Sequence, residues 1–141
     1  MLTIDADAHV IETERTWDYL EGADRRYRPV PITLDMPAGK RRNFWVIDGR
    51  LIGGRDNVGQ ETPKESREMA DIEARLRHMD EIGTDVQVLY PTLFLRPVTD
   101  RAEVELALCR AYNRWLADIW SKGKGRLRWA VQLPLLSMDQ A

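Results

Sequence analysis

Hydrophobic and polar residues alternate over the first ten positions, which predicts a β-strand over Leu2–Val10. Successive side chains of a strand point to opposite faces. One face then carries small or apolar side chains, those of Ile4, Ala6, Ala8 and Val10. The other face carries two carboxylates and an imidazole, those of Asp5, Asp7 and His9. The pattern predicts a strand that packs on one side and presents three polar groups on the other.

Helical periodicity appears twice further along the chain. Apolar residues recur at three- and four-residue spacing over Ser66–Ile82, and Gly83 follows at the position of a C-terminal cap. A longer helix is predicted over about 100–121, where Asp100 and Glu103 resemble a capping box. The two apolar stripes consist of Met69, Ile72, Leu76 and Met79, and of Val104, Leu108, Ala111, Trp115 and Ile119.

Three further segments have strand character. Asn43–Gly54 places β-prone residues on both sides of Asp48-Gly49, which predicts a hairpin with a tight turn, followed by a loop over 55–65. Asp85–Tyr90 is short and apolar, as a buried parallel strand is. Arg128–Pro134 predicts another strand, and the first turn of a helix follows at Ser137–Ala141.

The order is strand, hairpin insertion, helix, strand, helix, strand and the start of a helix. Alternation of strands and helices predicts an α/β fold with a parallel sheet and helices outside it. The last predicted strand has no covering helix within the sequence, so we expect a truncated domain.

Composition excludes several classes of protein. The 141 residues carry a formal net charge of −2, which suits one domain and gives no general attraction to nucleic acid or anionic membranes. No apolar run approaches the ~20 residues that span a bilayer, and acids stand where a signal peptide needs basic residues. A single cysteine excludes an internal disulfide framework and fits a cytoplasmic protein. A homo-oligomer is left open.

The polar face of the first strand is the main candidate for chemistry. Each unpaired buried charge costs several kcal/mol, and a divalent cation bound by Asp7 and His9 would remove that cost. A carboxylate oxygen and a neutral imidazole are ordinary ligands of zinc and similar ions. In the alternative, the two residues form a structural pair at a solvated edge. Spacing alone favours this alternative, because two residues do not make a metal site.

Other reactive residues have simpler interpretations. His78 lies off the apolar stripe of its helix, so we expect it to be solvent-exposed. Cys109 lies beside the second stripe, where we expect a small buried hydrophobe rather than a nucleophile. The glycines around Lys122–Gly125 lack the spacing of a phosphate-binding loop.

Five segments, taken in order, carry a resemblance to a known family: Ile4–Val10, Met79–Leu89, Tyr90–Thr92, Ala111–Leu116 and Arg126–Pro134. In order and spacing they resemble the N-terminal part of the amidohydrolase superfamily, in its amidohydrolase-related branch. That branch includes aminocarboxymuconate-semialdehyde decarboxylase and the resorcylate decarboxylases. With the resemblance counted, a metal site becomes the favoured interpretation of the first strand.

The resemblance implies a (β/α)8 barrel, of which residues 1–141 form a partial domain with an insertion at about 20–65. Such a barrel needs about 250 residues, so roughly half of it lies outside this sequence. Asp7 and His9 match the family's paired first-strand metal ligands, often His-x-His, and Asp5 matches a supporting acidic position. Zinc is the first choice of ion and manganese the second. The remaining ligands, a histidine and an aspartate, come from later strands in the family.

The implied function is that of a metal-dependent hydrolase or carboxy-lyase (decarboxylase), acting on a small carboxylated or cyclic substrate. The metal would act as a Lewis acid or would orient a substrate carboxylate. We expect the chain to be incomplete and inactive alone. One alternative is a non-catalytic binding module of the same fold, with Trp45 of the hairpin in its contact surface. Another is a complete small α/β domain in which Asp7 and His9 are structural.

Overall fold

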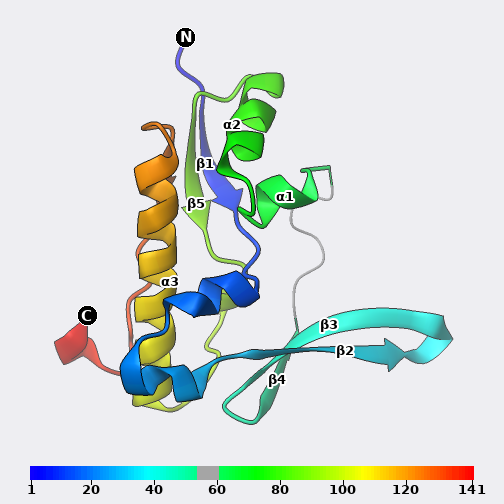
Figure 1. The fold of residues 1–141 in the computed structure, drawn as a ribbon, viewed down its shortest axis with the longest axis vertical. Helices are drawn as coiled ribbons and strands as arrows, with labels where there is room; N and C mark the ends of the chain where they lie inside the picture. The colour runs from blue at the N-terminus through cyan, green and yellow to red at the C-terminus, as the bar shows by residue number, and fades with distance from the viewer. Residues whose placement is uncertain (54–60) are drawn as a thin grey trace.

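The computed structural model of the chain describes residues 1–53 and 61–141, apart from the side chain of Ala38. Within these residues it contains two three-stranded sheets (Figure 1). The parallel sheet has the order β1-β5-β6, with bounds Ile4–His9, Val86–Tyr90 and Leu127–Trp129. The antiparallel sheet has the order β2-β3-β4, with bounds Val30–Met36, Lys40–Ile47 and Arg50–Gly53.

Two helices cover one face of the parallel sheet. The α-helices are α1 Lys64–Arg67, α2 Ile72–Glu81 and α3 Ala102–Lys122. Short 3-10 helices are η1 Glu14–Tyr19, η2 Gly22–Tyr27, η3 Pro37–Gly39, η4 Leu93–Leu95 and η5 Met138–Gln140. Side chains of α2 and α3 pack against Ala8, Leu89 and Leu127 of the three strands, and this contact forms the main core. None of the helices in the described part of the chain has the length and apolarity to cross a membrane.

The single helix predicted over Ser66–Ile82 is wrong, because the chain breaks between α1 and α2. Met69 has a positive φ of 53°, which no helical residue adopts. Asp71 then caps α2, its carboxylate accepting a hydrogen bond from the backbone N–H of Ala74 at 3.1 Å. An aspartate that caps a new helix competes with continuation of the old one. The apolar stripe still reaches the core, since Met69, Leu76 and Met79 are buried.

The strict alternation predicted for the first strand is also wrong, because β1 contains a bulge. Asp5 pairs with Gln87 and Ala8 pairs with Leu89, so Ala6 and Asp7 both lie opposite the single residue Val88. The bulge places Asp5 on the helix-covered face, beside Gln87. Of the four side chains expected on the packed face, Ala8 and Val10 are buried while Ile4 and Ala6 are exposed.

The predicted hairpin turn is confirmed. Asp48 and Gly49 both have positive φ, 50° and 74°, and they join β3 to β4. The strand β2, which pairs antiparallel with β3, was not predicted. Residues 54–60 lie outside the described part of the chain. They include the last residue of the predicted hairpin and much of the loop expected over 55–65. The last predicted strand is shorter than expected, as β6 ends at Trp129.

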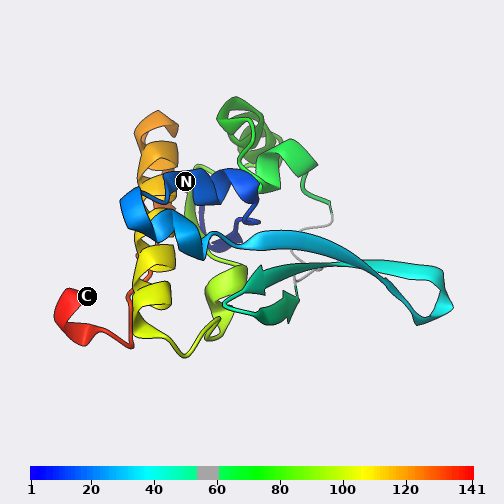
Figure 2. The ribbon, with the colours of Figure 1, turned by 60° about the horizontal axis from the view of Figure 1, so that its bottom comes forward.

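The antiparallel sheet forms an arm that projects from the body, as two views show (Figure 1, Figure 2). Its outer part, β2 and the first half of β3, is largely exposed. Its base is buried, because Ile47 enters a second core cluster with the N-terminal half of α3. Trp45 packs edge-on against Trp17 at 6.0 Å between ring centroids and is partly buried.

Candidate functional site

The carboxyl ends of β1 and β5 meet at one edge of the parallel sheet. His9 pairs with Tyr90 there, and the backbone N–H of Val10 donates to the Tyr90 carbonyl at 3.0 Å. Pro91 and Thr92 follow directly after β5. In parallel α/β folds this edge is where functional residues collect, because the loops that follow the strands converge there.

The structure brings Asp7 and His9 together at this edge. The His9 Nε2 lies 3.5 Å from the Asp7 Oδ1. The Asp7 side chain is 90% exposed and the His9 side chain 21% exposed. The His9 Nδ1 lies 3.0 Å from the carbonyl oxygen of Pro91. A carbonyl only accepts, so in a neutral ring this hydrogen bond places the proton on Nδ1 and leaves a lone pair on Nε2, the nitrogen beside Asp7.

Asp7 and His9 carry donor atoms of the kinds that bind metal ions. Histidine ligands of metals normally donate their second ring N–H to a carbonyl or carboxylate, as His9 does to Pro91. A carboxylate oxygen and an imidazole lone pair fit a divalent ion, which in structural zinc sites takes four ligands. Across residues 1–53 and 61–141, no group of three or more histidine, cysteine or acidic side chains could hold a metal ion. Asp7 and His9 would therefore need further donors to hold a metal ion.

Asp5 belongs to a buried polar network beneath the strand. Buried Arg75 of α2 donates through Nε to the Gln87 Oε1 at 2.7 Å, and the Gln87 Nε2 donates to the Asp5 Oδ2 at 3.0 Å. Asp5 in turn accepts from the backbone N–H of Asp7 at 3.1 Å. Burial lowers the pKa of Arg75 to about 10, and the nearby Asp5 carboxylate opposes that shift. Asp5 thus supports the backbone that carries Asp7.

Glu12 is the functional candidate that sequence reasoning missed. Its side chain is only 5% exposed, yet it carries a carboxyl group three residues beyond His9. The Oε1 accepts from the backbone N–H of Thr92 at 3.0 Å, and the Oε2 accepts from that of Leu93 at 3.1 Å. Burial raises the pKa of Glu12 to about 7, although the backbone hydrogen bonds act in the opposite direction. An acid just past the carboxyl end of a predicted parallel strand was the available signal.

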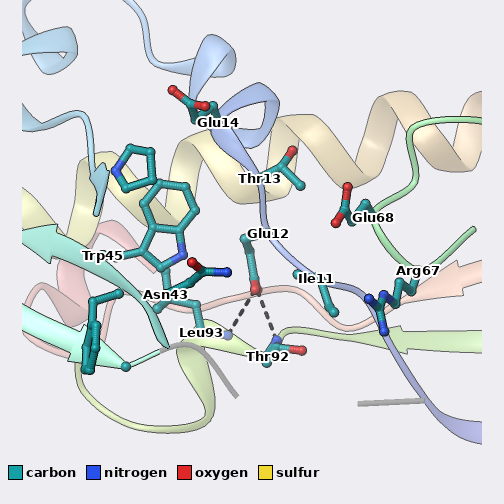
Figure 3. A pocket seen from close by; sticks show the side chains of 13 residues that line it. Ile11, Glu12, Thr13, Glu14, Asn43, Trp45, Arg67, Glu68, Thr92 and Leu93 are labelled. Atoms are coloured by element: carbon teal, nitrogen blue, oxygen red, sulfur yellow. Dashed lines mark hydrogen bonds between the residues drawn. The ribbon is translucent and has the colours of Figure 1, made fainter. Parts of the chain in front are cut away.

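A cavity of about 700 Å³ lies between this edge of the sheet and the base of the arm. Figure 3 shows Glu12 in its middle, with Trp45 on one side and Arg67 and Glu68 on the other. The wall is formed by Ile11, Glu12, Thr13, Glu14, Pro31, Asn43, Phe44, Trp45, Gly53, Arg67, Glu68, Thr92 and Leu93. The volume is in the range of pockets that bind small molecules.

Two other residues considered in the sequence lie elsewhere. The prediction that His78 is solvent-exposed is wrong: its side chain is 15% exposed, with Nδ1 3.6 Å from Glu81 on the next turn of α2. Cys109 is buried, as predicted. Burial raises the pKa of its thiol to about 12, so the group stays protonated and unreactive near neutral pH.

No family model and no curated protein matches the sequence. Among solved structures, the chain is similar to the crystal structure of an amidohydrolase from Mycobacterium avium subsp. paratuberculosis K-10. The TM-score is 0.61 at 19% sequence identity, and the match covers 92% of this chain and 42% of that one. The fold matches part of an amidohydrolase. The chain spans less than half the length of that relative.

Proposed function

We propose that residues 1–141 form the N-terminal part of a (β/α)8 barrel, and that Asp7 and His9 are two of its metal ligands. The protein would then be a metal-dependent hydrolase or carboxy-lyase of the amidohydrolase type. One observation carries the proposal: the His9 Nε2 lies 3.5 Å from the Asp7 Oδ1 while Nδ1 is held by the Pro91 carbonyl. The partial match to an amidohydrolase fold supports it.

Each residue of this edge has a distinct task in the proposal. A divalent ion, when bound, supplies Lewis-acid polarisation and lowers the pKa of a coordinated water. Asp7 offers an anionic oxygen and His9 a neutral nitrogen. The Pro91 carbonyl fixes the orientation of the His9 ring. The carboxylate makes the donor set harder than a pair of histidines, so zinc is the first choice and manganese the second.

The residues that line the cavity support the proposal of a small carboxylated or cyclic substrate. The rings of Phe44 and Trp45 line it, and they offer apolar surface to a cyclic molecule. Arg67 also lines it, and among the described residues its buried Nε has no hydrogen-bond partner. A carboxylate is the group that would satisfy a guanidinium in that position. Hydrolysis and decarboxylation would use Asp7 and His9 as the same metal ligands, so the proposal includes either reaction.

Metal binding tests the proposal. Zinc binding to the purified chain is measured by titration calorimetry, and we expect about one weakly bound ion per chain, since two donors fix only part of a site. His9→Ala and Asp7→Asn are expected to remove it, because each deletes one of the two donors. His78→Ala is the matched control, since it removes the chain's second histidine from α2. Undiminished zinc binding in His9→Ala and Asp7→Asn would refute the assignment.

A non-catalytic binding module of the same fold is the second candidate. The arm exposes apolar side chains of Val30, Leu34 and Leu51, as a surface that contacts another protein does. The same titration separates the two candidates, because a module of this kind has no need of zinc.

A further inference from the structure

One peptide unit at the edge of the sheet is held from both sides. The carbonyl of Pro91 accepts from the His9 Nδ1 at 3.0 Å, and the N–H of Thr92 donates to the Glu12 Oε1 at 3.0 Å. The carbonyl and the N–H belong to the same planar peptide group, which rotates as a rigid body. Whatever fixes the direction of that N–H therefore also fixes the direction of the carbonyl that faces His9.

We propose that Glu12 is a positioning residue that sets the tautomer and orientation of the His9 ring through the Pro91–Thr92 peptide. By holding the N–H of Thr92, it keeps the carbonyl of Pro91 aimed at the His9 Nδ1. That nitrogen then carries the proton, and the Nε2 lone pair faces Asp7. The value of this lone pair as a ligand rests on the proposed function, whereas the tautomer does not.

The surrounding contacts make this linkage stiff. Glu12 also accepts from the N–H of Leu93 at 3.1 Å, so both of its oxygens are bound to consecutive backbone groups. The Thr92 hydroxyl donates to the Val10 carbonyl at 2.6 Å, next to His9 in the sequence. The chain just after His9 is thus joined to the chain just after β5 at both Val10 and Glu12. Because Glu12 is buried, water does not compete strongly for these donors.

The linkage requires a carboxylate. Two oxygens of one side chain accept from two neighbouring N–H groups, and both oxygens of an ionised Glu12 can do so. An amide of the same size has one oxygen and one NH2 group. In Glu12→Gln the NH2 would face a backbone N–H, donor against donor, so one of the two hydrogen bonds is lost. We expect the Pro91–Thr92 peptide to reorient as a result.

The experiment reads the tautomer directly. Long-range ¹H–¹⁵N NMR spectra of the full chain at a pH of about 8 distinguish a neutral imidazole protonated on Nδ1 from one protonated on Nε2. The chain has two histidines, so His78 is an internal reference in the same spectrum. We expect the Nδ1–H form of His9 in the wild type and a shift toward the Nε2–H form in Glu12→Gln. Glu73→Gln, the same change at an exposed side chain of α2 outside the cavity wall, should leave His9 unchanged.

Zinc titration is the second readout. Loss of an orienting partner of a histidine ligand typically costs about 10–100-fold in metal affinity, and we expect a loss in that range for Glu12→Gln and none for Glu73→Gln. If Glu12→Gln does not fold by circular dichroism, Glu12→Asp replaces it. Its carboxylate is one methylene shorter and cannot reach both N–H groups, so the same shift in tautomer is expected.

The outcomes separate this inference from the proposed function. An Nε2–H form of His9 in the wild type, or an unchanged tautomer in the folded Glu12 variant, overturns the positioning role. A shifted tautomer in a chain that binds no zinc supports the positioning role and contradicts the metal site.

Discussion

The two sheets of this chain contain the same number of strands and are built in opposite ways. The parallel sheet assembles from residues 4–9, 86–90 and 127–129, whereas residues 30–53 make the antiparallel arm almost without interruption. Helices bury one face of the parallel sheet, while among the described residues no helix covers the exposed outer part of the arm. Groups that must meet from distant parts of the sequence, such as Glu12 and Thr92, therefore lie at the parallel sheet.

Several side-chain contacts between the described residues join the base of the arm to the body. Asp48 of the hairpin turn accepts from Arg101 at 2.8 Å and from the hydroxyl of Thr99 at 2.8 Å, and Arg50 pairs with Asp100. These contacts hold the base of the arm over the cavity. The outer strands depend on the pairing of β2 with β3 instead. Substitutions in the two regions should accordingly differ in effect.

The largest expected difference is in packing. Leu116 of α3 is fully buried in the main core, and Leu116→Ala should lower the free energy of unfolding by about 2–5 kcal/mol through lost burial and a cavity. Leu34 of the arm is 37% exposed, and Leu34→Ala makes the same chemical change where less burial is lost. Urea denaturation of both variants measures the difference. Equal losses would show that the outer arm is as firmly packed as the body.

The next difference is in the dependence of stability on pH. The pKa of Glu12 is raised from 4.5 to about 7 in the folded chain, so the folded form binds a proton more tightly than the unfolded form. The stabilisation from this proton is fully present below about pH 4.5 and is lost as pH rises through about 7. Between pH 4 and 8 the free energy of unfolding of the wild type should therefore fall by about 3 kcal/mol relative to that of Glu12→Gln.

Asp35→Asn is the control for that measurement. Asp35 is an exposed carboxylate on β2, 3.4 Å from Arg41, and water solvates it in both states. Its substitution should leave the pH dependence of unfolding nearly unchanged. If the free energy of unfolding changed with pH in the same way in the wild type and in Glu12→Gln, the carboxyl of Glu12 would not be buried in solution.

The smallest expected effect is in the hairpin turn. Gly49 has φ of 74°, and Gly49→Ala should cost about 1–2 kcal/mol because a Cβ is disfavoured in this left-handed conformation. Gly53→Ala adds the same methyl group where the nearest atom, Cε1 of Phe44, is 3.6 Å away and φ is not positive. We expect Gly53→Ala to leave the midpoint of thermal unfolding unchanged or slightly raised. A lower midpoint for Gly53→Ala than for Gly49→Ala would contradict this account of the turn.

Periodicity and turn chemistry predicted most of the elements. The helix expected over 100–121 is α3, Ala102–Lys122, and the strand expected over Asp85–Tyr90 is β5, Val86–Tyr90. Both have patterns that local physics determines, a long apolar stripe and a short apolar run. The strand β2 lacked such a pattern because both of its faces are largely exposed. Without burial on one side, a strand has no alternation to detect.

The candidate site was only partly predictable. Asp7 and His9 were proposed from the family resemblance together with their spacing, and the structure places their side chains 3.5 Å apart. Glu12 could not be identified as buried, because the groups that bury and bind it, Thr92 and Leu93, are 80 and 81 residues away in the sequence. The break at Met69 likewise follows from the cap at Asp71, which periodicity does not register.

The bulge in β1 lets one six-residue strand meet two incompatible requirements. Two carboxylates spaced two apart would share a face in a regular strand, and their like charges would compete for one environment. The extra residue turns Asp5 toward the guanidinium-linked network inside and leaves Asp7 with His9 at the open edge. The two acids look equivalent in the written sequence, yet they occupy different surroundings and remain linked, because the Asp5 carboxylate accepts from the backbone N–H of Asp7.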